Sequence, residues 1–164
     1  MNKVDTRPQL PSLQIDILTQ DESWPDVRAL IERAVTSALT IACFNETTEL
    51  SIALSNDALI QDLNKQYRGK DKPTNVLSFP QDDDFSLGDI VLALETIQKE
   101  AEEQDKSFDD HFVHLVVHGT LHLLGHDHEE DDEAEEMEAL EVKILNDMGI
   151  ENPYEDSDTP IDEV

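Results

Sequence analysis

The sequence predicts a single α+β domain in which helices pack on a small mixed sheet of four strands. The chain has 164 residues, and a domain of that length buries a hydrophobic core of its own. Segments typical of strands and of helices follow one another without the regular strand–helix–strand rhythm of parallel α/β folds. We expect residues 1–10 to form a lead-in, residues 11–154 the domain, and residues 155–164 an acidic, disordered tail.

Four short segments have the alternating or continuous apolar pattern of β-strands. The predicted strands cover residues 13–18, 49–54, 75–79 and 87–94. Pro80 ends the third strand, and only a short acidic turn separates that strand from the fourth. We therefore expect the third and fourth strands to pair.

Five segments carry residues at the three-to-four-residue spacing of a helix, most of them with an apolar stripe on one side. The predicted helices cover residues of about 24–44, 57–67, 95–105, 108–124 and 134–148. Ser23 is the predicted cap of the first helix, with Pro25 in its first turn. Trp24, next to this cap, is expected to pack as a hydrophobic staple.

The chain is strongly acidic, with 39 acidic residues against 11 basic ones and a formal net charge of −28. Such a surface repels the phosphate backbone of nucleic acid, so composition alone argues against an RNA or DNA partner. The charges are uneven, however. Residues 129–164 hold sixteen acids and one base, whereas four of the eleven bases lie between Lys65 and Lys72. A bound cation beside this basic segment would create a locally positive groove, because physiological salt screens charges beyond about 8 Å.

The single cysteine, Cys43, excludes an internal disulfide and favours a reducing, cytoplasmic location. We expect it to be a small core residue. No apolar run approaches the roughly 20 residues of a membrane span, and the first residues lack a secretory signal. The sequence therefore predicts a cytoplasmic protein without a membrane partner.

All six histidines lie within eighteen residues: His111, His114, His118, His122, His126 and His128. His118 and His122 are four residues apart, so on a helix their imidazoles share one face and can bind one ion. Gly125 permits a turn after that helix, and the turn can bring a third imidazole, by spacing His128, back to the same ion. Zn²⁺ binds neutral imidazole at about 2.0–2.1 Å, and three protein ligands leave one position for water, as in catalytic sites.

The histidine spacing matches the metzincin protease pattern except at one position. In that pattern a glutamate, the general base of peptide hydrolysis, follows the first histidine. Here Gly119 follows His118. The substitution argues against a protease and leaves the ion site intact, so a metallopeptidase is the weaker alternative.

Residues 118–128 fit the signature H-G-x-L-H-L-x-G-(Y/H)-D-H, and through it the chain resembles the YbeY family of bacterial metal-dependent endoribonucleases. The resemblance covers roughly Leu13 to Tyr154. It is also carried by residues 63–80, 87–90, 137–141 and 149–154. One departure is His126, where many members have tyrosine. This histidine lies between His122 and His128 and could compete for the ion.

The resemblance implies a small α+β fold and a single-strand-specific endoribonuclease. The family matures the 3′ end of small-subunit rRNA and acts in ribosome quality control, which makes RNA, the small ribosomal subunit and its associated proteins the implied partners. It also implies one zinc ion at His118, His122 and His128 and a functional role for Arg68. A ribosome-associated binding factor with structural zinc is the second alternative.

Arg68 also has a chemical rationale of its own. Its planar guanidinium can pair bidentately with the non-bridging oxygens of a phosphodiester under attack, which lysine cannot do. The competing interpretation is an ordinary solvated loop residue. His114 lies one helical turn before His118 and either orients a ligand from behind or is a core residue, while His111 is expected to be exposed near a helix start.

Overall fold

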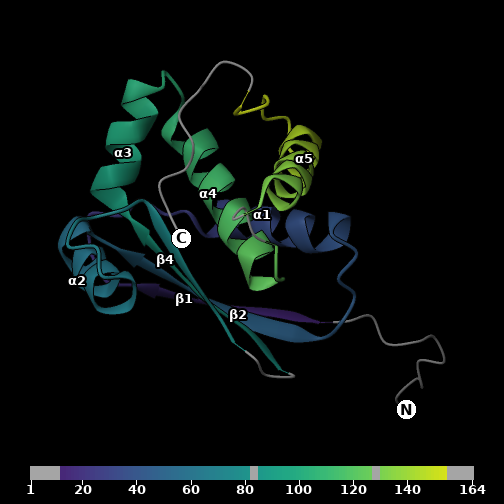
Figure 1. The fold of residues 1–164 in the computed structure, drawn as a ribbon, viewed down its shortest axis with the longest axis horizontal. Coiled ribbons are helices and arrows are strands. Elements are labelled where there is room, and N and C mark those ends of the chain that lie inside the picture. The colour runs from purple at the N-terminus through teal and green to yellow at the C-terminus, as the bar shows by residue number, and fades with distance from the viewer. Residues whose placement is uncertain (1–11, 82–84, 127–129, 155–164) are drawn as a thin grey trace, which may run out of the picture.

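A four-stranded mixed sheet and five helices make up the described part of the chain (Figure 1). The structure is a computed structural model, and it describes residues 12–81, 85–126 and 130–154. The strands are β1 (Leu13–Thr19), β2 (Thr48–Ser55), β3 (Val76–Pro80) and β4 (Ser86–Ala93). The helices are α1 (Arg28–Ile41), α2 (Asp57–Arg68), α3 (Leu94–Glu103), α4 (Phe108–Leu123) and α5 (Asp131–Asp147). The predicted α+β class is confirmed.

The strand order is β1-β2-β4-β3. β2 runs parallel to both β1 and β4, and β3 pairs antiparallel with β4, as predicted from the short turn between them. Because successive side chains of a strand point to opposite faces, β4 serves two hydrophobic clusters. Ile90 and Leu92 belong to the large core, whereas Val91 and Ala93 belong to a smaller cluster on the other face.

The two faces of the sheet are covered unequally. The large core joins the sheet to α1, α4 and α5, and Figure 1 shows these helices together on one side of it. The smaller cluster joins Ile60 and Leu63 of α2 to Leu77 and Val91 on the opposite face. α4 is the central helix of the large core, because every residue from His111 to Leu123 is buried.

Trp24 is anchored in the core, where it is 8% exposed. Its ring packs edge-on against Phe112, with 5.5 Å between the ring centroids, and its Nε1 donates a hydrogen bond of 2.7 Å to the Ser55 carbonyl. The predicted capping role of Ser23 is wrong, since α1 begins at Arg28 after Val27. The backbone N–H of Ser23 instead donates to Asp21, which holds this segment in a turn ahead of the helix.

Cys43 was predicted to be a core residue, and this prediction is also wrong. It is exposed and has a φ of 63°, a left-handed conformation just past the end of α1. The chain turns there, so the side chain points away from the core that the helix contacts.

Within residues 12–81, 85–126 and 130–154, no helix has both the length and the apolar character of a membrane span.

Candidate metal centre

His118 and His122 lie together on α4, as their four-residue spacing predicts. Their Nε2 atoms are 3.1 Å apart, and the two rings meet nearly at right angles, with centroids 4.6 Å apart. Both residues are buried, at 3% and 8% exposure. The helix thus brings two imidazole nitrogens to one point inside the protein.

The third predicted ligand, His128, lies outside the described residues. Gly125 has a φ of 97°, the left-handed conformation expected where the chain leaves α4. His126 follows it, half-buried, with its backbone N–H bonded to the Leu121 carbonyl. Within the described ranges, no three His, Cys, Asp or Glu side chains are grouped to hold an ion, so His126 does not complete a site with His118 and His122 there.

A buried carboxylate contacts the histidine pair through His118. Glu141 of α5 is 1% exposed, and its Oε1 accepts a short hydrogen bond from Nδ1 of His118. Its other oxygen, Oε2, lies 3.3 Å from Nε2 of His114 and accepts a short hydrogen bond from the Tyr154 hydroxyl. Sequence reasoning missed Glu141. The available signal was an acid at a core position of an amphipathic helix, between Met137 and Ile144, both of them buried.

The charges of this network follow from its surroundings. Burial would raise the pKa of the Glu141 carboxyl, but hydrogen bonds and charge interactions with His114 and His118 outweigh burial and hold that pKa well below its usual range. Burial lowers the pKa of His114, and the opposing effect of Glu141 does not restore it. At neutral pH we therefore expect an ionised Glu141 beside a neutral His114. His114 is thus a buried residue that also reaches the candidate site, through Glu141.

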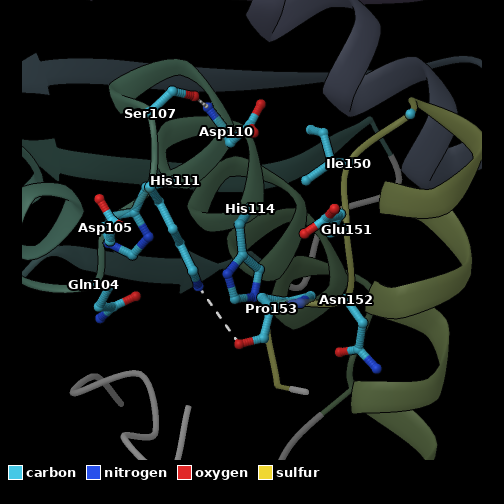
Figure 2. Close-up of a pocket in the computed structure, with 12 residues that line it drawn as sticks. Gln104, Asp105, Ser107, Asp110, His111, His114, Ile150, Glu151, Asn152 and Pro153 are labelled. Atoms are coloured by element: carbon cyan, nitrogen blue, oxygen red, sulfur yellow. Dashed lines mark hydrogen bonds between the residues drawn. The ribbon is translucent and has the colours of Figure 1, made fainter. Parts of the chain in front are cut away.

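His111 is not exposed, contrary to the prediction. It is 2% exposed, and its Nε2 lies 2.9 Å from Glu100 of α3, whose same oxygen accepts a 3.0 Å hydrogen bond from Asn75. The prediction failed because α3 and residues 149–153 cover this end of α4. Figure 2 shows His111, His114 and Pro153 among the residues that line the resulting cleft, which has a volume of about 400 Å³.

Gly119 lets α4 lie directly against the sheet. A Cβ atom at this position would be 3.0 Å from Cγ2 of Ile90 and 3.2 Å from Oγ of Ser78. The Ser78 hydroxyl also points to the Gly119 carbonyl, at 3.5 Å. The position that holds glutamate in the protease pattern therefore has no room here for a side chain of that size.

Arg68 lies on a different element from the histidines. It is the last residue of α2, is partly buried, and precedes Gly69, whose φ of 71° ends the helix. α2 packs on the opposite face of the sheet from α4. The chain then runs from Arg68 into β3, whose Ser78 contacts α4 beside His118.

The nearby Lys65 lies 3.9 Å from Asp71 in an exposed ion pair, which contributes little to stability.

The fold and the site together define an α+β protein with a paired-histidine centre on its central helix and a carboxylate behind it. The family model described as Endoribonuclease YbeY matches residues 14–149. This chain belongs to that family.

The sequences of known relatives are similar to this one over nearly the whole chain. The Endoribonuclease YbeY of Parvibaculum lavamentivorans is 48% identical, over 90% of this chain and 88% of its own. The protein of the same name from Chelativorans sp. is 49% identical, over 88% of this chain and 94% of its own. Among solved structures, the solution structure of TM1509 from Thermotoga maritima matches with a TM-score of 0.57 and 28% identity, over 88% of this chain and 97% of that one.

Proposed function

We propose that this chain is a zinc-dependent endoribonuclease that cuts single-stranded RNA and matures the 3′ end of small-subunit rRNA. The names of the relatives support ribonuclease activity. The same proposal includes a cytoplasmic location, a role in ribosome quality control, and the small ribosomal subunit with its proteins as partners. These finer points rest on the family resemblance.

One distance carries the zinc part of the proposal. Two nitrogens bound to one tetrahedral zinc at 2.0–2.1 Å are about 3.3 Å apart. The Nε2 atoms of His118 and His122 are 3.1 Å apart, which is close to that spacing. His128 is the proposed third ligand, and together the three imidazoles fit the ligand type that zinc accepts.

The chemistry of the site divides between the ion and the protein. When bound, zinc supplies a Lewis acid that polarises a phosphate oxygen or lowers the pKa of water. The buried His118 and His122, together with His128, would hold the ion. Arg68 pairs with the non-bridging oxygens as they gain charge, and its two-pronged geometry holds the phosphate in one orientation. Residue 119 is glycine and cannot act as the glutamate base of the protease pattern. The nucleophile is therefore either water or the 2′-hydroxyl of the RNA.

Arg68 variants test the catalytic proposal. We expect Arg68→Ala to slow cleavage of a single-stranded RNA by about 10²–10³-fold, the usual cost of removing one group that stabilises the transition state. Zinc content and the thermal melting temperature should stay as in the wild type. Arg33→Ala, an exposed arginine of α1, is the matched control for the loss of one positive charge.

The outcomes separate the rival functions. His118→Ala should lose both zinc and cleavage. If Arg68→Ala and wild type cut RNA equally fast, the catalytic role of Arg68 is wrong. If neither cuts RNA but both bind the small subunit, the alternative of a binding factor with structural zinc is correct. An RNA with a methylated 2′-oxygen at the cleaved position identifies the nucleophile, because only the water route would still cut it.

A further inference from the structure

We propose that Glu141 is a positioning residue for the metal centre, held in place by Tyr154 and His114, and that it keeps the proton of His118 on Nδ1 so that Nε2 faces the ion. The inference rests on the proposed zinc site and deepens it. It assigns roles to three residues, Glu141, Tyr154 and His114, that lie 13 or more positions from one another in the sequence.

The position of Glu141 is costly unless its charge is matched. A buried carboxylate loses its hydration, which costs several kcal/mol unless partners replace the water. Glu141 is 1% exposed and sits on the side of α5 that carries the buried Met137, Ile144 and Leu145. An apolar residue would fill this place without that cost. The chain instead surrounds the carboxylate with three polar groups.

The contacts of Glu141 fix the protonation pattern of His118. Both oxygens of Glu141 act as acceptors, since Oε2 accepts from the Tyr154 hydroxyl and Oε1 contacts Nδ1 of His118, so the imidazole hydrogen lies on Nδ1. In a neutral imidazole, Nε2 then carries a lone pair, which is the form that binds a metal. This is the same Nε2 atom that lies 3.1 Å from Nε2 of His122.

The second oxygen of Glu141 locks the carboxylate in one orientation. Oε2 accepts from the Tyr154 hydroxyl and lies 3.3 Å from Nε2 of His114, which is itself 3.3 Å from that hydroxyl. Tyr154 follows the segment that closes the cleft beside His114 in Figure 2. Residues 149–154 therefore tie α5 to α4 at the point where Glu141 meets His118.

The first test uses the metal-free protein and needs no activity. Nitrogen chemical shifts of ¹⁵N-labelled histidine report which ring nitrogen carries the proton. We expect His118 in the wild type to be protonated on Nδ1, and Glu141→Leu, which has no acceptor at this position, to shift His118 towards the Nε2-protonated form. A wild-type His118 protonated on Nε2 would overturn the inference.

The second test measures zinc affinity by competition with a chelator. We expect Glu141→Leu to weaken zinc binding by about 10–100-fold, the usual effect of removing such a partner. Tyr154→Phe, which removes one hydroxyl, should weaken zinc binding in the same direction but less. The matched control is Glu100→Leu. It removes a carboxylate of α3 that lies 2.9 Å from His111, and His111 is on the same helix as His118. This control should leave zinc affinity and the His118 proton unchanged.

The outcomes distinguish this inference from the proposed function. Equal zinc affinity in Glu141→Leu and Glu100→Leu overturns the inference, even if the wild type cuts RNA. A wild type that needs Glu141 for zinc but does not cut RNA supports the inference and overturns the proposed function. If Glu141→Leu does not fold by circular dichroism, Tyr154→Phe and the wild-type proton position still decide the question.

Discussion

At the scale of single residues, Gly119 is decisive because it sets how closely α4 approaches the sheet. Two side chains, Ile90 and Ser78, occupy the space into which a Cβ would point. Ile90 is completely buried, so it has little freedom to move aside. The glycine that separates this chain from the protease pattern is therefore also a packing requirement.

We expect Gly119→Ala to lower the free energy of unfolding by up to about 2 kcal/mol. Alanine gains about 1 kcal/mol in helix propensity, but forcing a methyl group into a filled core costs about 1–3 kcal/mol. Urea unfolding of both proteins checks the prediction. Ile90→Val removes the Cδ1 atom, which lies 3.2 Å from the point where the new methyl group would sit, and should recover part of the loss. A more stable Gly119→Ala would show that the core yields at this point.

Residue-level prediction from the sequence succeeded where the partners are close along the chain. His118 and His122 are one helical turn apart, so their spacing alone places them together. Glu141 lies 23 residues beyond His118, and its contact depends on how α5 packs against α4. The spacing could not reveal that packing. His111 was misjudged for the same reason, since the elements that cover it come from elsewhere in the chain.

At the scale of elements, the start of α2 is tied to the turn before α1. Asn56 caps α2 by accepting a 2.9 Å hydrogen bond from the Leu59 backbone, and its amide nitrogen donates to Asp21 at 3.0 Å. Asp21 also accepts from the Ser23 backbone N–H at 2.8 Å. This N–H, the Asn56 amide and the Ser23 hydroxyl hold the pKa of Asp21 below its ordinary value of 3.8. The tie positions the helix that ends at Arg68.

The lowered pKa makes this tie dependent on pH. A carboxyl with a lower pKa in the folded state stabilises the protein above its ordinary pKa, and this stabilisation is lost as the pH falls through the folded-state pKa. We expect wild type to be more stable than Asp21→Asn at pH 7, and the difference to shrink below pH 3.8, as measured by urea unfolding at each pH. In an Asn56→Ser background, which keeps a cap but loses the amide donor, the pH-dependent part should be smaller. A difference that does not change with pH would contradict the assignment.

Most element positions could be predicted because each helix and strand carries its own period of apolar residues. All nine predicted segments coincide with the described helices and strands to within a few residues. The start of α1 was missed because the burial of Trp24 and the Asp21 turn override the local capping pattern. The order β1-β2-β4-β3 could not be predicted, since parallel pairing depends on how the connecting helices pack rather than on the strands themselves.

At the scale of the whole molecule, the net charge of −28 conflicts with binding RNA. The four basic residues between Lys65 and Lys72 lie at the end of α2 and in the loop that follows it, while α5 carries acidic residues through its first turn. The negative charge of the whole molecule repels RNA at long range and slows its approach. The basic segment attracts the RNA backbone at short range. Salt separates the two effects, because it shortens the range of the repulsion before it weakens direct phosphate contacts.

On the proposed function, we therefore expect an RNA cleavage rate that first rises and then falls with salt. Between about 10 and 100 mM salt the screening length falls from about 30 to 10 Å, so kcat/KM on single-stranded RNA should rise by about tenfold. Above that range it should fall as phosphate contacts are screened. Replacing the five acids among residues 155–164 with their amides removes charge without changing length, and it should raise the rate at low salt more than at 150 mM. A rate that falls steadily from the lowest salt, unchanged by this replacement, would show that the acidic surface does not act on RNA at a distance.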